Sequence, residues 1–295
     1  MDELNYEKLI IVRIWEGLGN QLFQYAYARA LKEQGKNVAL DLDKTYSEAF
    51  GQYKNNDVRT NAVQNYRITL PAADVRTFGK YDFILQDTFG RRLKCSLAKK
   101  GIGKYAFHEE TVQHYQEASA NVRANTYVKG WFQSEKYFAD IRPILLEELL
   151  PKELPVFSEE VRELLRDEQC VSIHFRRGDY VRIHHELNIA YFHQAVEEIR
   201  RKYDHPKFLI FSDDVDWVLR NLRIDEKCIS ANPDNVLKDY EELYLMSLCK
   251  SNIISNSTFS WWGAWLNRNP DKTVIAPKLW LEGQEGILPP SFTVI

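Results

Sequence analysis

The residues best suited to chemistry lie in one run, Ser172 to Tyr180, which reads SIHFRRGDY. In an extended strand, alternation places His174 and Arg176 on one face and the apolar residues of the run on the other. Arg176, Arg177 and Asp179 then crowd the carboxyl end of that strand. Two adjacent guanidiniums beside a buried strand need compensating anions. Asp179 can compensate one and a diphosphate the other, so the run predicts a diphosphate site. The alternative is an internal Arg–Asp pair with His174 as a core histidine.

Two further runs of polar residues follow predicted strands. Asp213 and Asp214, in IFSDD, could accept hydrogen bonds from guanine or ribose, and either one could instead cap the next helix. Ser255 to Thr258 precede a helix, where hydroxyls and N–H groups make a phosphate seat. The alternative for this third run, ISNSTFSWWGAW, is a capping cluster followed by an aromatic core patch.

A glycine-containing turn, Gly17-Leu18-Gly19-Asn20-Gln21, separates the first predicted strand from the first helix. The third glycine of a dinucleotide fingerprint would fall at Leu22, so NAD and FAD are disfavoured. Amides of Asn20 and Gln21 could instead bind sugar hydroxyls or a phosphate. Asp41 and Asp43 have the spacing of a metal-binding DxD pair, but we interpret them as solvated charge at a strand end. We therefore predict no metal site.

The elements that position these residues alternate regularly. Strand, glycine turn, helix and strand over residues 8–42 form a βαβ unit, with Gly35 ending the helix. The segment Pro151 to Ser158 carries two prolines and ends in a good N-cap residue, which predicts domains 1–153 and 154–295. Residues 50–125 receive no assignment. The second domain is predicted to be a doubly wound α/β domain. Its predicted helices are 159–166, 191–203, 215–222, 235–249 and 259–266, and its predicted strands are 171–175, 207–212, 228–231, 252–255 and 272–276.

The composition excludes several protein classes. The chain has 295 residues and a formal net charge of −3, so nothing attracts it generally to nucleic acid. Four scattered cysteines indicate buried thiols in a reducing compartment. The chain has no secretory leader pattern and no apolar run near the roughly 20 residues that cross a bilayer. We therefore expect a soluble, cytoplasmic protein.

Five segments together resemble the bacterial α-1,2-fucosyltransferases of glycosyltransferase family 11. The His-x-Arg-Arg-x-Asp element is also similar to that of α-1,6- and peptide O-fucosyltransferases, so it marks the use of GDP-fucose rather than a linkage. One residue departs from the family pattern, because such sequences usually carry glycine where this chain has Glu16. The matching segments are GLGNQLFQYAYARAL (17–31), GWFQSEKYF (130–138), HFRRGDY (174–180), FSDD (211–214) and SNSTFSWWGAWL (255–266).

The resemblance implies a GT-B-like α/β fold, with two Rossmann-like domains facing each other across a cleft. It implies GDP-β-L-fucose as donor, a galactose-terminated glycan as acceptor, inversion at the anomeric carbon and no required metal or other cofactor. The C-terminal domain would bind the donor, and the N-terminal domain would lie on the acceptor side. Action at the inner face of a membrane, through a lipid-linked acceptor, is compatible with it.

Individual roles follow from the same resemblance. Arg176 would stabilise the leaving diphosphate, and Asn20 would lie near the reacting centre. Arg177 and Asp179 would hold the loop, while His174 with Asp213 or Asp214 would contact ribose and guanine. The remaining predicted donor contacts are Ser255, Asn256, Ser257, Thr258 and Phe259, and the acceptor-side loop is Gly17, Gly19 and Gln21.

Several alternatives stay open on the sequence. Inversion needs a base for the acceptor hydroxyl, and Glu16 and Asp179 are candidates by position alone. The chain could make another fucosyl linkage, or bind a nucleotide sugar or glycan without turnover. A glycoside hydrolase would need two carboxylates flanking the bond, and the arginine-rich strand end suits a diphosphate better.

Overall fold

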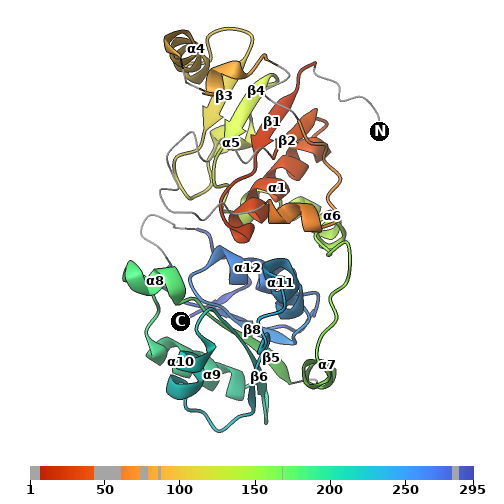
Figure 1. Cartoon of the computed structure of the whole chain (residues 1–295), viewed down its shortest axis with the longest axis vertical. Coiled ribbons are helices and arrows are strands. Elements are labelled where there is room, and N and C mark those ends of the chain that lie inside the picture. The colour runs from red at the N-terminus through yellow and green to blue at the C-terminus, as the bar shows by residue number, and fades with distance from the viewer. Residues whose placement is uncertain (1–6, 43–60, 74–78, 86–87, 168, 281–285) are drawn as a thin grey trace. The chain divides into compact units, whose positions relative to one another are not determined.

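The computed structural model describes residues 7–42, 61–73, 79–85, 88–167, 169–280 and 286–295. The chain forms two compact units that divide between Leu149 and Leu150, next to the boundary predicted after residue 153. Gly286 and Ile287 belong with the first unit. Each unit is an α/β structure built on a parallel sheet (Figure 1). The two Rossmann-like units of the predicted GT-B-like class are therefore present.

The first unit contains a four-stranded sheet in the order β2-β1-β4-β3, and every neighbouring pair is parallel. Its strands are β1 (Ile10–Arg13), β2 (Val38–Asp41), β3 (Ala106–Glu109) and β4 (Thr126–Lys129). Its α-helices among the described residues are α1 (Leu18–Glu33), α4 (Phe89–Lys99), α5 (Glu117–Ala120) and α6 (Arg142–Glu148). Short 3₁₀ turns cover Ala62–Asn65, Asp82–Leu85, Glu135–Tyr137 and Ala139–Ile141.

Helix α1 connects β1 to β2 as the predicted βαβ unit. Its apolar stripe is buried, and Gly35 ends it with a φ of +79°. The Gly35 N–H donates to the Lys32 carbonyl and the Lys36 N–H to the Leu31 carbonyl, which is the Schellman arrangement. This left-handed residue turns the chain back toward β2, as the sequence predicted.

The second unit contains a six-stranded parallel sheet in the order β10-β9-β8-β5-β6-β7. Its strands are β5 (Cys170–Phe175), β6 (Lys207–Ser212), β7 (Cys228–Ser230), β8 (Ser251–Ile253), β9 (Val274–Ala276) and β10 (Thr293–Val294). Its helices are α7 (Glu159–Arg166), α8 (Gly178–Arg182), α9 (Ile189–Arg200), α10 (Val215–Asn221), α11 (Asp239–Ser247) and α12 (Thr258–Trp265).

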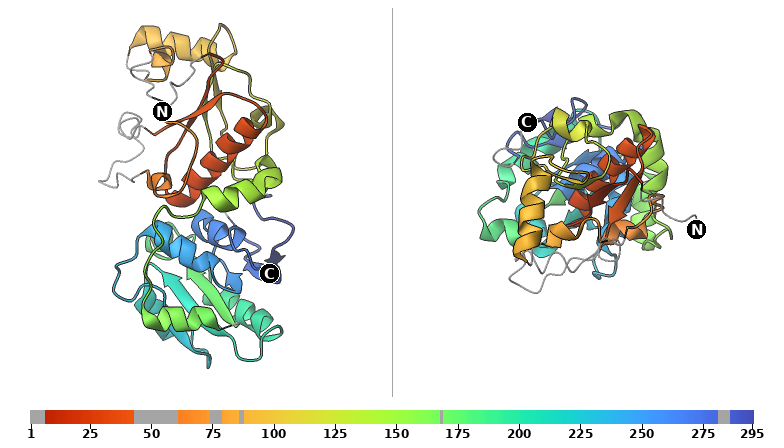
Figure 2. Two further views of the ribbon diagram at one scale, coloured as in Figure 1. Left: turned by 90° about the vertical axis from the view of Figure 1, so that its right-hand side faces the viewer. Right: turned by 90° about the horizontal axis from the view of Figure 1, so that it is seen from above.

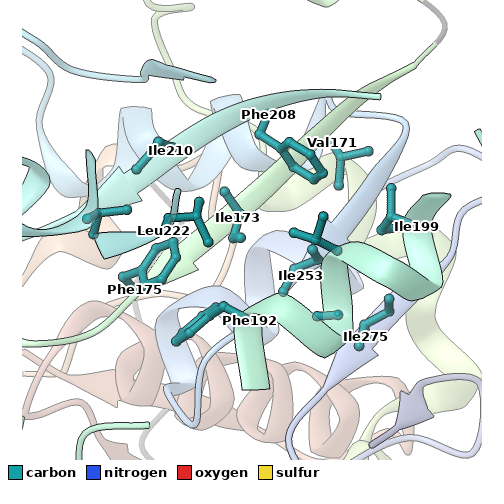
Figure 3. Packing of buried hydrophobic residues seen from close by; sticks show 13 residues of the cluster. Val171, Ile173, Phe175, Phe192, Ile199, Phe208, Ile210, Leu222, Ile253 and Ile275 are labelled. Carbon is teal, nitrogen blue, oxygen red and sulfur yellow. The ribbon is translucent and has the colours of Figure 1, made fainter. Parts of the chain in front are cut away.

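Alternate residues of the central strands serve two different cores. Val171, Ile173 and Phe175 of β5 pack with α9, and Figure 3 shows them facing Phe192 and Ile199. The residues between them point to the opposite face of the sheet, where β6 packs against α7 and α11. Both faces of β5 are covered, so all six of its residues are buried, the polar Ser172 and His174 included.

The predicted elements of the second unit are present, with three differences. The helix predicted from Asn235 begins at Asp239, because the Asn232 side chain accepts hydrogen bonds from the Val236 and Leu237 N–H groups and holds a loop there. Helix α8 and strand β10 were not predicted. The described part of residues 50–125, which received no assignment, contains α4, β3 and α5.

The expected burial of two residues, Asp41 and Cys228, was wrong. Asp41 is buried rather than solvated, and it accepts a 2.6 Å hydrogen bond from the Tyr127 hydroxyl. Its predicted companion Asp43 lies outside the described residues. Cys228 is half-buried, whereas the other three cysteines are buried as expected.

Candidate functional site

Strand β5 is where the order of the second sheet reverses. The chain runs from β5 to β6 and β7 on one side and returns to β8 on the other (Figure 1). Ligands of open α/β sheets bind beyond the carboxyl ends of the strands at such a reversal. His174, Arg176 and the segment 255–259 lie at the ends of β5 and β8. The topology therefore brings two of the predicted runs to one place, and FSDD follows at the end of the adjacent β6.

His174 is a buried, neutral histidine. Its Nδ1 lies 2.8 Å from the Ser255 hydroxyl, and its ring lies beside that of Phe259, with 5.5 Å between centroids. Burial, and secondarily the charge of Arg176, lowers the pKa of His174 to about 3. Because the ring stays uncharged at neutral pH, it can offer one donor and one acceptor but no positive charge.

Arg176 is held by two carboxylates at the end of β5. One guanidinium nitrogen lies 2.8 Å from Asp179 Oδ1 and another lies 3.1 Å from Asp213 Oδ2. The predicted Arg176–Asp179 pair is present, and Asp213 is an additional partner. The Arg176 side chain is still 30% exposed. Since a guanidinium has five N–H donors, this one is fixed in position while keeping edges for a ligand.

Arg177, which was expected to hold the loop, has its partners in the segment that follows β6. Its Nε lies 3.3 Å from Asp214 Oδ2, and its guanidinium stacks 3.4 Å over the Trp217 ring. Asp214 also accepts a hydrogen bond from the Trp217 N–H and so caps α10. Asp213 accepts one from the Arg177 N–H at 2.8 Å. The two aspartates have separate tasks, Asp214 at the helix and Asp213 beside Arg176.

The segment after β8 is mostly committed to internal contacts. Ser255 is 1% exposed and bonded to His174, and Ser257 caps α12 by accepting from the Phe259 N–H. Asn256 is buried and donates to the His185 carbonyl. Thr258 and Phe259 are half-buried at the start of α12. The capping and aromatic-core interpretation therefore describes much of this run, while its predicted phosphate contacts stay predictions.

A cavity of about 410 Å³ lies within the second unit beside Asp213 and Asp214. It lies between the carboxyl ends of β6 and β7 and the starts of α10 and α11. The sequence indicated Asp213 and Asp214 but not its opposite wall, where the Asn232 amide donates 2.6 Å to Glu242. Burial raises the pKa of Glu242. The polar residues that line the cavity include Ser212, Asp213, Asp214, Asp216, Ser230, Asn232, Asn235 and Glu242.

The glycine turn of the first unit also lies at a reversal of strand order. The chain runs from β1 to β2 on one side and reaches β4 on the other, so the ends of β1 and β4 are neighbours. Asn20 follows β1, and its Oδ1 accepts a 2.7 Å hydrogen bond from Gln133, which follows β4. Because the oxygen is engaged, the Asn20 NH₂ group is the side available to a ligand.

Gln21 and Glu16 shape this turn from inside. Gln21 is buried, donates to the Glu16 carbonyl at 2.7 Å and accepts from the Val63 N–H at 3.1 Å. Gln21 is thus a structural residue of the predicted acceptor-side loop. Glu16 has a φ of +70°, a conformation that favours glycine. This positive φ explains why family members usually carry glycine at this position.

Glu110, which sequence reasoning missed, holds the segment that carries Gln133. Its carboxylate accepts hydrogen bonds from the N–H groups of Trp131 and Phe132 and from the Tyr137 hydroxyl, at 3.1, 2.6 and 2.7 Å. Burial raises the pKa of Glu110 to about 7. Glu110 lies in the stretch without clear periodicity, so no pattern marked it.

Neither a metal cluster nor a membrane-crossing helix is found in the part of the chain that the structure describes. No three His, Cys, Asp or Glu side chains there gather as metal ligands do. None of the helices described is long and apolar enough to span a bilayer.

The family model of glycosyl transferase family 11 matches residues 9–285. This chain belongs to glycosyltransferase family 11. The resemblance drawn from five short segments is therefore confirmed over nearly the whole sequence. In this family 11 chain, four of the five segments meet at the two strand reversals, at the ends of β1, β4, β5 and β8, and the fifth follows β6.

Three relatives show how the family varies. An Escherichia coli alpha-1,2-colitosyltransferase is 29% identical over 94% of this chain and 94% of its own length. The Escherichia coli O-antigen biosynthesis glycosyltransferase WbnK is 30% identical over 90% of this chain and 93% of its own. A mouse galactoside 2-alpha-L-fucosyltransferase, Sec1, is 22% identical over 88% of this chain and 65% of its own. Two of these names state different transferred sugars, colitose in the first and L-fucose in the third.

Proposed function

We propose that this family 11 glycosyltransferase transfers L-fucose from GDP-β-L-fucose to the 2-hydroxyl of a terminal galactoside. The transfer inverts the anomeric carbon and needs no metal ion. The acceptor would belong to a bacterial surface glycan, made in the cytoplasm or at the inner face of the membrane. The name of WbnK, which refers to O-antigen biosynthesis, supports that class of acceptor.

The observation that carries the proposal is the setting of Arg176. Departure of GDP places negative charge on the β-phosphate, and a fixed cation there lowers the barrier without needing to reorganise. Arg176 is such a cation, because Asp179 and Asp213 hold it at the strand reversal while leaving it 30% exposed. It would do for the leaving group what a divalent ion does in other transferases.

The surrounding residues suit the rest of the donor. The cavity beside Asp213 would receive the nucleoside, with polar groups available for guanine and ribose. Thr258 and the first amides of α12 would face the diphosphate, as helix N-termini do. Neutral His174 would position Ser255 and would offer a hydrogen bond without adding charge.

The acceptor side would be served by Asn20 of the first unit. Gln133 fixes its amide orientation, so the NH₂ group can donate to a sugar hydroxyl. Of the two carboxylates considered as base, Asp179 is paired with Arg176 and Glu16 replaces a residue that is usually glycine in the family. Neither is therefore placed in the proposed mechanism.

The relatives' names support an α-1,2 linkage and leave a second candidate donor. A colitosyltransferase is 29% identical, and colitose is L-fucose without its 3-hydroxyl. A site that hydrogen-bonds the 3-hydroxyl would reject colitose strongly, whereas a merely roomy site would accept both sugars. GDP-colitose is thus the second donor to be tested.

The decisive experiment is the kinetics of Arg176→Ala with GDP-fucose and a β-galactoside. We expect kcat at saturating donor to fall about 10²–10³-fold, because a charge stabiliser of the leaving group is removed. The matched control is Arg182→Ala, which removes an exposed arginine at the end of the neighbouring helix α8 and should keep full turnover. EDTA should leave the wild-type rate unchanged, and NMR of the product gives the linkage.

Near wild-type turnover of Arg176→Ala would remove the proposed role of this residue. A rate that EDTA abolishes and Mg²⁺ restores would contradict metal independence. Transfer from GDP-colitose but not from GDP-fucose would replace the proposed donor with the second candidate. Binding of GDP with no transfer or donor hydrolysis on any galactoside would indicate a non-catalytic binding protein.

A further inference from the structure

Helix α4 of the first unit presents its large apolar residues to solvent. Phe89, Leu93 and Leu97 are 83%, 54% and 39% exposed, and they recur every four residues, so they share one face of the helix. Ile102, just beyond the helix, is 56% exposed. We call Phe89, Leu93, Leu97 and Ile102 the outer face of α4. In the views of Figures 1 and 2, α4 lies at the periphery of its unit.

The two buried residues of α4 are both small. Cys95 and Ala98 are 3% exposed and pack in the cluster that contains Phe107 and Tyr127. A helix that serves only its own core has its larger apolar residues inside. In α4 the arrangement is reversed, so the outer face offers apolar area to something outside the unit.

The same segment is strongly basic in a chain whose formal net charge is −3. Residues 89–104 contain no Asp or Glu and six basic residues, namely Arg91, Arg92, Lys94, Lys99, Lys100 and Lys104. All except Arg91 are exposed. The acidic neighbours Asp82 and Glu109 pair with part of this set, at 3.5 Å from Arg91 and 2.6 Å from Lys99. Lys100 and Lys104 take part in no ion pair of the described residues.

We propose that the outer face of α4 binds an anionic lipid surface. Apolar side chains flanked by Lys and Arg on a short surface helix are the combination that lies in a membrane interface. The basic residues match the anionic headgroups, and Phe, Leu and Ile would enter the boundary with the acyl chains. Charge complementarity thus favours an anionic lipid leaflet over the same basic face of a second copy, which would repel it. The proposal does not depend on the donor or the linkage.

The test is co-sedimentation of the full chain with vesicles. We expect binding to vesicles of equimolar phosphatidylglycerol and phosphatidylcholine, little binding to phosphatidylcholine alone, and release by high salt. Lys100→Gln with Lys104→Gln should weaken binding about thirtyfold, at about 1 kcal/mol for each charge. Leu93→Ser with Leu97→Ser should weaken it about tenfold or more.

Leu154→Ser with Val156→Ser is the matched control, since these residues are 59% and 85% exposed in the second unit. This control should bind vesicles as wild type does. The α4 variants should keep wild-type thermal unfolding and wild-type turnover with a soluble acceptor. If the serine variant unfolds, the glutamine variant still decides the question.

Three outcomes would overturn the proposal. Binding that is equal for neutral and anionic vesicles, or unchanged in both α4 variants, would exclude the outer face as the lipid contact. A wild-type dimer in analytical ultracentrifugation that the serine variant abolishes would make this face an interface between copies.

Discussion

Glu16 shows how one residue can reveal the shape of a turn. It has a φ of +70° immediately before the glycine turn, and its carbonyl accepts a hydrogen bond from the buried Gln21. A side chain in this conformation costs about 1 kcal/mol relative to glycine. The departure from the family pattern is therefore a local strain that the turn imposes.

Glu16→Gly is expected to raise the free energy of unfolding by roughly 1 kcal/mol, because glycine adopts this φ without steric cost. Glu16→Ala keeps a Cβ atom and should give no comparable gain. Urea denaturation of the two variants measures the difference. Equal stability of the glycine and alanine variants would show that φ at this position carries no strain.

Arg176 and Arg177 show which contacts of a residue can be predicted from the sequence and which cannot. Alternation correctly placed His174 and Arg176 opposite the apolar face of β5, because period two is a local property of a strand. The partners of Arg177 could not be predicted in this way, since Asp214 and Trp217 come from another strand end. No local pattern states which residues of a neighbouring strand will reach a given guanidinium.

At the scale of elements, Glu110 links β3 to the segment after β4. It accepts two backbone hydrogen bonds from Trp131 and Phe132, and so supports the turn that presents Gln133 to Asn20. Gly130 is needed beside it, because an added Cβ would lie 2.7 Å from Glu110 Cβ. Strand pairing brings these residues together from separate stretches of the chain.

The pH dependence of stability should report this buried carboxyl. Burial raises the pKa of Glu110 from an ordinary 4.5 to about 7, so the folded chain holds an extra proton between those values. The free energy of unfolding should therefore fall as pH rises from about 4.5 to about 7, and Glu110→Gln should remove that fall. Denaturant titrations across this range measure it.

Glu109→Gln is the control for that prediction. Burial opposes ionisation of Glu109, but the hydrogen bond and charge of Lys99, with Lys129, hold its pKa below the ordinary value. Its contribution to stability is lost only below pH 4.5, so this variant should keep the wild-type slope above that pH. Identical slopes in wild type and Glu110→Gln would contradict the buried-acid interpretation.

At the scale of the whole molecule, the proposed nucleotide contacts all belong to one unit. Saturating GDP should therefore slow amide exchange most in residues 174–180, 211–214 and 255–259. At a hundredfold excess over Kd, binding adds about 2.7 kcal/mol to the cost of opening, about a hundredfold in rate. Hydrogen–deuterium exchange with mass spectrometry measures this. Protection confined to residues 17–21 and 130–133 would contradict a donor site in the second unit.

The sequence alone determined the family, the α/β class and most helices and strands of the second unit. Those features are encoded locally. The signals are the spacing of apolar residues, capping residues such as Ser158 and Asp214, and the short motifs shared with the family. Only the tertiary structure decided which strand ends are neighbours, and with them the Asn20–Gln133 contact, the double hold on Arg176 and the role of Glu110. The outward face of α4 also needed it, because exposure depends on what the rest of the chain covers. Contacts between distant residues arise from strand order and packing, which no single stretch of sequence specifies.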